Sequence, residues 1–205
     1  MIKVVHVGHS CFIIKNGEEK VIIDPYDDSI GYPSIQQLTN LNYINYILVS
    51  HDHYDHNCVE NIELLEKADT FKIEKIDSFH DNQQGTIRGP NIIHVIEAYG
   101  IRVCHLGDLG HLLTDEQIKK IGKVDVLLIP VGGTYTIDHT EAVEVIKQLN
   151  PTTVIPMHYK TDETKLDIAP VDNFISEIGK DYEVLICTEN YLNYVKTDKK
   201  KVYVL

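Results

Sequence analysis

The 205-residue sequence predicts a layered α/β or α+β fold. Its first half holds short β-branched segments bounded by turn residues, a pattern typical of strands. Its second half alternates such segments with segments whose apolar residues have helical spacing. Because strands and helices of this kind each bury one face, we expect packed sheets with helices outside them. A chain of this length suits one hydrophobic core, so a single domain is expected over residues 1–205.

The first half of the chain is expected to consist mainly of strands. Asn16-Gly17 is a strong hairpin signal between two of them. The segment 58–67 has apolar residues at helical spacing and predicts a helix, and a shorter helix is expected over residues 34–41. The expected strands cover residues 3–7, 11–15, 21–24, 46–49, 70–76, 85–88, 92–98 and 101–106.

The second half is expected to hold three helices. The segment 114–117 matches a capping box and Gly122 a helix stop, which together predict the first helix. Asp138 or Thr140 is expected to cap the second helix, and the third covers residues 171–178. The expected strands cover residues 124–129, 152–155, 183–187, 191–195 and 202–204.

Composition and charge narrow the class of protein. The chain is 43% hydrophobic and 24% charged, which is ordinary for a soluble globular protein. It has no apolar run near the roughly 20 residues that cross a bilayer and no secretory signal at its start, so a cytoplasmic location is expected. The four cysteines form no C-x-x-C pair, which argues against a disulfide framework. The net charge of −12 disfavours nucleic acid and anionic membranes as partners, but not small anionic substrates.

The loop after the apolar strand at 46–49 carries a dense set of metal-ligand side chains. His51, His53, Asp55 and His56 fall within six residues. A loop at the carboxyl end of a buried strand is a common place for a site in α/β proteins. His51 and His53 lie two residues apart, so on extended backbone their side chains share one face. The pattern therefore indicates a metal site.

The types of side chain in this loop narrow the choice of metal. Imidazoles and carboxylates without thiolates suit Zn²⁺, Mn²⁺ or Fe²⁺, and they argue against a structural zinc site built on cysteine. Four ligands in one loop could hold one metal ion. Two further histidines and an aspartate in later loops could complete a second site.

Further motifs follow along the chain. They are Gly8-His9-Ser10, Ser78-Phe79-His80-Asp81, Arg88-Gly89-Pro90-Asn91, His105-Leu106-Gly107-Asp108-Leu109-Gly110-His111, Pro130-Val131-Gly132-Gly133 and Ile155-Pro156-Met157-His158-Tyr159. With the H-x-H-x-D-H cluster, they make the chain resemble the metallo-β-lactamase-fold hydrolases. The likeness is greatest to the small stand-alone branch that includes ascorbate-6-phosphate lactonase. The resemblance covers nearly the whole chain and implies a four-layer αββα sandwich.

The resemblance implies two divalent metal ions in one site. It assigns His51, His53 and His80 to the first ion and Asp55, His56 and His158 to the second, with Asp108 as the bridge. Zn²⁺ is the expected metal, with Mn²⁺ and Fe²⁺ as alternatives. A hydroxide between the two ions would be the nucleophile, and Asp55 would hold or shuttle its proton.

The implied function is metal-dependent hydrolysis of a small, anionic ester, lactone or phosphodiester. His9 is expected to contact the substrate or to support the ligands, and a buried structural histidine is the alternative. Arg88 and Lys160 are candidates for clamping a phosphate or carboxylate. The alternative for each of these two is a solvated surface cation.

Other functions are compatible with parts of the pattern. A phosphodiesterase or nuclease acting on nucleic acid is disfavoured by the acidic composition and the short chain. A diiron oxidoreductase of this fold replaces the second motif histidine by glutamate, so His53 argues against that class. A metal-binding protein without turnover is the remaining alternative. The sequence leaves open whether the chain forms a homo-oligomer.

Overall fold

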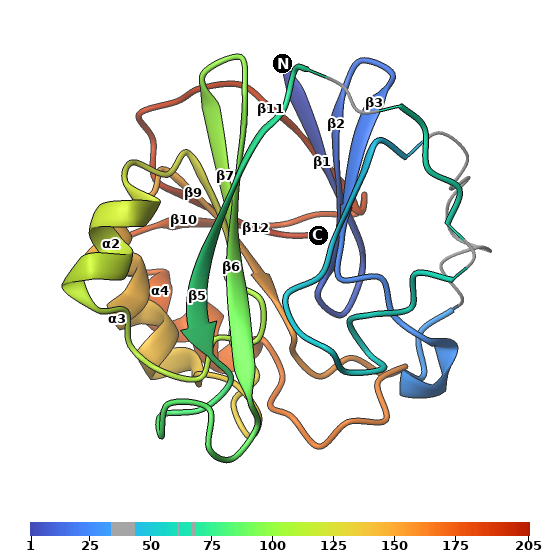
Figure 1. Ribbon diagram of the computed structural model, residues 1–205. Coiled ribbons are helices and arrows are strands. Elements are labelled where there is room, and N and C mark those ends of the chain that lie inside the picture. Colours follow the sequence, from blue (N-terminus) through green and yellow to red (C-terminus); the bar gives the residue numbers. More distant parts are fainter. Residues whose placement is uncertain (34–43, 61, 67–68) are drawn as a thin grey trace.

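The computed structural model describes residues 1–33, 44–60, 62–66 and 69–205, and two β-sheets packed face to face form its centre (Figure 1). One sheet has five strands in the order β11-β1-β2-β3-β4, and the other has seven in the order β10-β12-β9-β8-β7-β6-β5. The strands are β1 (Ile2–Gly8), β2 (Cys11–Asn16), β3 (Glu19–Ile23), β4 (Tyr46–Leu48), β5 (Lys72–Phe79), β6 (Pro90–Ala98), β7 (Ile101–His105), β8 (Val126–Pro130), β9 (Thr153–Met157), β10 (Glu183–Ile186), β11 (Tyr191–Tyr194) and β12 (Lys201–Val204).

The α-helices of the described residues cover the outer face of the seven-stranded sheet (Figure 1). They are α2 (Asp115–Ile121), α3 (His139–Leu149) and α4 (Asp172–Ile178). The short 3-10 helix η1 (Asp28–Ile30) and irregular segments lie on the outer side of the five-stranded sheet. The expected layered fold of two packed sheets is therefore confirmed, and the α-helices of the described residues lie on one of its two outer faces.

Strand direction brings many loops to one end of the sandwich. Strands β7, β8 and β9 are parallel neighbours, and β3 is parallel to β4 in the other sheet. Parallel strands place their carboxyl ends at the same sheet edge. The ends of β1 and β5 reach this edge as well, at the bottom of Figure 1. Segments distant in sequence therefore meet in one cluster of loops.

Three apolar clusters hold these layers together. Side chains of both sheets fill the space between them, including Phe12, Ile14 and Leu128. A second cluster packs α3 and α4 on the seven-stranded sheet. A third cluster covers the outer face of the five-stranded sheet. Strand β1 therefore has buried side chains on both of its faces. Full burial of one such side chain contributes about 1.5–3 kcal/mol, so these clusters supply most of the drive to fold.

Two expectations for local structure are wrong. Residues 85–88 form turns rather than a strand, because the backbone N–H groups of this segment bind the Asp81 carboxylate instead of a neighbouring strand. The helix expected over 58–67 is also missing from the described part of that segment. There, the N–H of Leu65 donates to the carbonyl of Ile44, a distant partner that draws the chain out of helical geometry. The helix expected over 34–41 lies outside the described residues.

The hairpin and the caps agree with their sequence signals. Asn16 pairs with Glu19 across a two-residue turn. The Thr114 side chain accepts from the N–H of Gln117 in a capping box, as expected. Of the two candidate caps for α3, Asp138 is the one observed. Its Oδ1 accepts from the N–H groups of Thr140 and Glu141, each at 2.9 Å.

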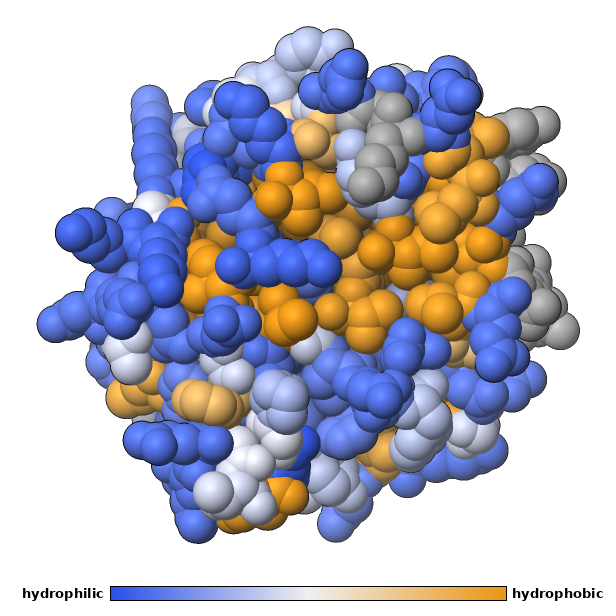
Figure 2. Space-filling model, in the orientation of Figure 1, coloured by the Kyte–Doolittle hydropathy of each residue, from blue (hydrophilic) through white to orange (hydrophobic). Residues whose placement is uncertain are grey.

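The surface is polar over much of the view in Figure 2, where an apolar band crosses the middle. This is the face on which the edge strand β5 lies in front (Figure 1). Among the described residues, no helix combines the length and the apolar character that a membrane span requires.

Replacing Asp138 by alanine is expected to lower the free energy of unfolding by about 1 kcal/mol, because α3 loses its N-cap. Urea denaturation of Asp138→Ala beside the parent protein measures this difference. Asp138→Ser retains a side-chain acceptor and is expected to recover most of it. An unchanged midpoint in the alanine variant would show that the cap contributes nothing to stability.

Candidate metal centre

The loop after β4 starts the site. It leaves the sheet beside the end of β3, where Asp24 accepts from the N–H of Ser50 at 2.7 Å. The carbonyl of His53 then accepts from the N–H of His56 at 2.9 Å, so the loop turns tightly. This turn places the side chains of His51 and His56 inside the protein and leaves His53 exposed.

Four imidazoles meet around one buried carboxylate, that of Asp108. The Nε2 atoms of His80 and His158 lie 3.2 and 3.1 Å from Oδ2 of Asp108. Nε2 of His51 lies 4.0 Å from the same oxygen, and Nε2 of His56 lies 3.3 Å from Oδ1. The carboxylate therefore stands between ligands that come from three separate segments, since His51 and His56 share the loop after β4.

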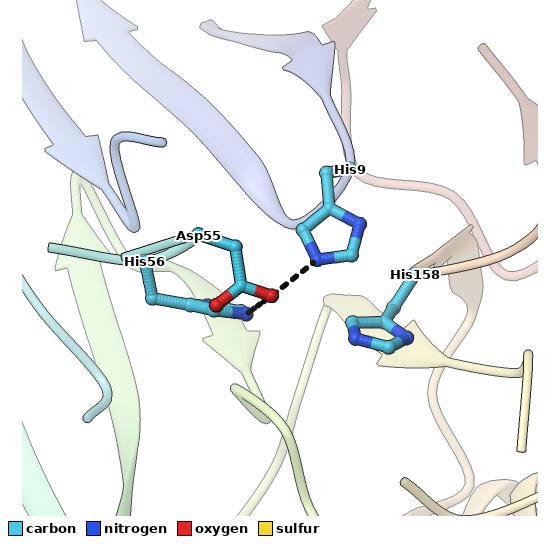
Figure 3. A group of neighbouring side chains, drawn as sticks. All are labelled: His9, Asp55, His56 and His158. Atoms are coloured by element: carbon cyan, nitrogen blue, oxygen red, sulfur yellow. Dashed lines mark ion pairs between the residues drawn. The ribbon is translucent and has the colours of Figure 1, made fainter. Parts of the chain in front are cut away.

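The donor atoms form groups of the size that a metal ion needs. In each of three groups, one nitrogen or oxygen per residue lies within 4.8 Å of all the others: His51, His53 and His80; His51, His56 and Asp108; and His9, Asp55, His56 and His158. Figure 3 shows the last group, in which His9 and His158 converge with the neighbouring residues Asp55 and His56 from separate parts of the chain. The structure thus brings all seven sequence-predicted ligands together.

The far side of three rings is fixed by hydrogen bonds. Nδ1 of His56 lies 2.9 Å from Asp24 Oδ2, and Nδ1 of His51 lies 2.9 Å from Ser50 Oγ, which donates to the same carboxylate. Nδ1 of His80 lies 3.0 Å from the carbonyl of Tyr135. With Nδ1 as donor, each neutral ring leaves Nε2 free to bind a metal, an arrangement common at metal sites.

The loop that carries His80 is shaped by the next residue, Asp81. Its carboxylate accepts four backbone N–H groups between Gln83 and Arg88, at 2.8 to 3.0 Å. Burial would raise the pKa of Asp81, but these donors outweigh it and lower the pKa to about 2. Gly110 lies against the backbone of His80 and Asp81, and a Cβ there would collide with it. The motifs around His80 and Asp108 thus fit together by direct backbone contact.

Asn91 positions Asp108. Its side-chain oxygen accepts the N–H of Asp108 at 3.0 Å, and its amide group donates to the carbonyl of Leu106 at 2.9 Å and to Ser78 Oγ at 2.7 Å. Sequence reasoning did not single out Asn91, Asp24 or Ser50 as supports. The sequence does carry a signal for Asp24. This residue ends an apolar strand just before a proline, and the ligands of the next loop likewise stand directly after an apolar strand.

Burial and charge pairing shift the pKa values of His56 and Asp108 in opposite directions. Burial would lower the pKa of His56, but Asp108 and Asp24 raise it well above its usual value. Burial would raise the pKa of Asp108, but His158 and His56 hold it well below its usual range. Burial lowers the pKa of His51 to about 3, with a smaller contribution from His56. A neutral, ligand-ready imidazole and a buried anion therefore lie side by side.

The set of donors fits divalent metal ions. Several buried nitrogen and oxygen atoms have no hydrogen-bond partner among the described residues: Nε2 of His51 and His56, both ring nitrogens of His9, Nδ1 of His158 and Oδ1 of Asp108. Buried polar atoms are almost always paired, and an unpaired one costs about 1–3 kcal/mol. Imidazole and carboxylate donors that lack partners are the atoms Zn²⁺, Mn²⁺ and Fe²⁺ bind.

A cavity of about 320 Å³ opens onto these residues. Its walls are formed by His53, Tyr54, Asp55, His80, Arg88, Asp108, Tyr135, His158 and Leu166. Arg88 reaches this cavity, donates to the carbonyl of Thr134 at 3.0 Å and lies 5.7 Å from the ring centroid of Tyr135. Lys160 instead donates to the carbonyls of Thr164 and Leu166, so it ties a loop together. Arg88 is therefore the better placed of the two candidate clamps.

Four other histidines have contacts of their own. Nε2 of His94 and His105 lie 3.0 and 2.8 Å from the carbonyls of Val49 and Ser10. His111 accepts from the N–H of Phe79 at 3.2 Å, and His139 lies 3.8 Å from Glu177. These contacts give each histidine a structural role. His9, by contrast, lies within the cluster of donors rather than on the cavity wall.

Comparisons with known proteins agree with this geometry. Residues 3–158 match the family model described as a beta-lactamase superfamily domain. A UPF0173 metal-dependent hydrolase of Thermoplasma volcanium is 30% identical over 87% of this chain and 93% of its own length. A solved structure from Thermotoga maritima, of the metallo-β-lactamase superfamily, is 37% identical, with a TM-score of 0.75. That likeness covers 100% of this chain and 98% of the other.

A more distant structure shares the fold alone. The short form of human tRNase Z is 12% identical, covers 78% of this chain and 93% of its own, and has a TM-score of 0.62. The narrower likeness to ascorbate-6-phosphate lactonase stays a prediction. With a family model over most of its length and a relative 30% identical along 87% of it, the chain belongs to the metallo-β-lactamase superfamily, in the family of the UPF0173 metal-dependent hydrolases.

Proposed function

We propose that the protein is a dinuclear metal-dependent hydrolase that acts on a small anionic ester, lactone or phosphodiester. The observation that carries this proposal is the convergence of unpartnered nitrogen and oxygen atoms on Asp108 at the wall of a cavity. Two relatives support it by name: the Thermoplasma volcanium protein is called a metal-dependent hydrolase, and the Thermotoga maritima structure bears the name of a Zn-dependent one.

We assign the donors to two sites that share Asp108. His51, His53 and His80 would hold one ion, Asp55, His56 and His158 the other, with Asp108 between them. Zn²⁺ is the metal we expect, because the set is rich in imidazole. When bound, such ions supply Lewis acidity, which makes water more acidic and polarises the bond to be cleaved.

Asp55 is proposed to hold the proton that hydrolysis moves. It lines the cavity, and its Oδ2 lies 3.5 Å from His9 Nε2 and 3.8 Å from His56 Nε2. Burial would raise the pKa of Asp55, but His9 and His56 lower it to about 2. The side chain is therefore ionised near neutral pH and carries the negative charge that a metal ligand needs.

Arg88 is proposed to bind the anionic part of the substrate. It is the cation among the cavity-lining residues, and a guanidinium can pair with carboxylate or phosphate in two parallel hydrogen bonds. A cavity of about 320 Å³ suits a small molecule, and the net charge of −12 disfavours nucleic acid. A small anion is therefore favoured over a polynucleotide, and the shared fold of tRNase Z carries no information on substrate.

Alanine in place of His51 or Asp108 is expected to abolish hydrolysis and leave the fold intact. The loss should exceed the roughly 10–100-fold that removal of a supporting residue costs, because a ligand itself is lost. The assay is a metal-supplemented screen of lactones, thioesters and phosphodiesters, with circular dichroism to check folding. His139→Gln, remote from the cluster, is the matched control and should keep full activity. Parent-like turnover in either alanine variant would refute the assignment.

Metal occupancy is expected to fall as the pH drops. In the metal-free protein, Asp108 raises the pKa values of both His56 and His80 against the effect of burial. Protons therefore stay on these rings above the usual imidazole value of about 6.5, and a metal ion must displace them. Affinity should rise with pH, with release of protons on binding. Elemental analysis after dialysis against fixed metal from pH 8 to pH 5 measures this, and constant occupancy would speak against an imidazole-rich site.

Arg88→Ala is expected to raise KM for an anionic substrate by about 10–100-fold, the equivalent of about 1.5–3 kcal/mol for a hydrogen bond to a charged group. For a neutral substrate of the same size, KM should change little. Arg88→Lys, which keeps the charge but loses the planar fork, should fall between the two. Equal losses for charged and neutral substrates would instead point to a structural role for Arg88.

A further inference from the structure

We propose that His9 is a ligand of the second metal ion, which would then be held by His9, Asp55, His56 and His158. This inference rests on the proposed function, since it concerns one of the two ions. The resemblance to the superfamily supplied the other three residues and Asp108, but not His9. Sequence reasoning placed His9 at the substrate or behind the ligands.

The distances around His9 are those of neighbouring ligands on one ion. Nε2 of His9 lies 3.5 Å from Oδ2 of Asp55, which is longer than the usual 2.7–3.2 Å of an N–H···O hydrogen bond. With metal–ligand bonds of about 2.1 Å, ligand atoms of a tetrahedral site lie about 3.4 Å apart. Nε2 of His56 lies 3.8 Å from the same oxygen, so it has a similar spacing. In Figure 3 the rings of His9 and His158 lie on the same side of the Asp55 carboxylate.

Burial leaves His9 in need of a partner. The side chain has no exposed surface, and neither ring nitrogen has a hydrogen-bond partner among the described residues. The ring centroids of His158 and His56 lie only 4.3 and 5.3 Å away. Leaving such buried atoms unpaired is unfavourable, because each costs about 1–3 kcal/mol. A cation shared by the group would bind one ring nitrogen of each histidine and the Asp55 carboxylate.

The backbone at Gly8 and His9 has an unusual conformation, which sets the direction of the His9 ring. His9 has φ +52°, in the left-handed region that non-glycine residues seldom occupy, and Gly8 before it has φ +149°. A Cβ on Gly8 would lie 2.9 Å from the Tyr26 hydroxyl, so only glycine lets the chain pass here. The β1–β2 pairing shifts register at this point. Such irregularities are often found beside active sites, where they redirect a side chain.

The same turn is fastened to a second ligand. The carbonyl of His9 accepts from the backbone N–H of His158 at 3.3 Å and lies 3.0 Å from Nε2 of His6. His9 and His158 therefore come from different sheets but share a direct backbone contact. This contact holds the two rings at a fixed separation, as two ligands of one ion require.

The competing role is a hydrogen bond alone, in which Nε2–H of His9 would orient Asp55 without touching a metal. Glutamine separates the two roles, because its amide can donate to Asp55 but is a poor ligand. If His9 is a ligand, His9→Gln should lose the second ion as fully as His9→Ala does. If His9 only orients Asp55, His9→Gln should bind both ions like the parent protein.

The test is titration of the metal-free protein with Co²⁺, followed by visible absorption and by elemental analysis after gel filtration. The parent chain should bind two equivalents, whereas His9→Ala and His9→Gln should bind the second at least about tenfold more weakly, with an altered spectrum for that step. His139→Gln should match the parent. Thermal unfolding of each metal-free variant checks that the fold is kept.

Each outcome decides one point. Fewer than two equivalents in the parent protein would overturn the dinuclear proposal itself. Two equivalents in the parent and unchanged second-site affinity in both His9 variants would overturn the role of His9 alone. A crystal of the parent soaked in Co²⁺ needs no variant: anomalous density about 2.1 Å from Nε2 of His9 would support ligation, and a separation beyond about 3 Å would refute it.

Discussion

The Asp108 carboxylate is buried with four imidazole nitrogens around it, and the rest of the architecture serves that arrangement. A lone buried anion is very costly, and so is a buried imidazole without a partner. Grouped, they offset part of one another's cost, and the unpaired atoms that remain are those a dication binds. The stability of the fold and the affinity for metal therefore depend on the same cluster of side chains.

The sandwich makes the arrangement feasible because it delivers rigid strand ends from both sheets to one place. β4 supplies the histidine-rich loop, β5 supplies His80, and the ends of β7 and β9 supply Asp108 and His158. Behind these ligands, Asp24, Ser50 and Asn91 fix ring and carboxylate orientation through hydrogen bonds. Because the ligands stand on four different segments, the positions of the donor atoms depend on how the two sheets pack.

Local sequence determined what could be predicted. The H-x-H-x-D-H loop, the Thr114 capping box and the strand periods are short-range signals, and the structure agrees with their placement. The supporting role of Asp24 could not be predicted, because its partners, Ser50 and His56, lie 26 and 32 residues away. They reach it only through the pairing of β3 with β4. The strand expected at 85–88 failed for a different reason, although its partner is close in the sequence. Its N–H groups bind the Asp81 side chain, a partner that a period of alternation cannot reveal.

The short turn after Gly133 both fixes the ring of a proposed metal ligand and holds the proposed substrate clamp. The carbonyl of Tyr135 receives Nδ1 of His80, while the neighbouring carbonyl of Thr134 receives Arg88. A mutation that remodels this turn to admit a new molecule would therefore also tilt an imidazole in the cluster. Divergence of substrate range within such a scaffold is coupled to metal retention, so new specificities should arise more readily through a residue such as Leu166, which borders the cavity from another segment.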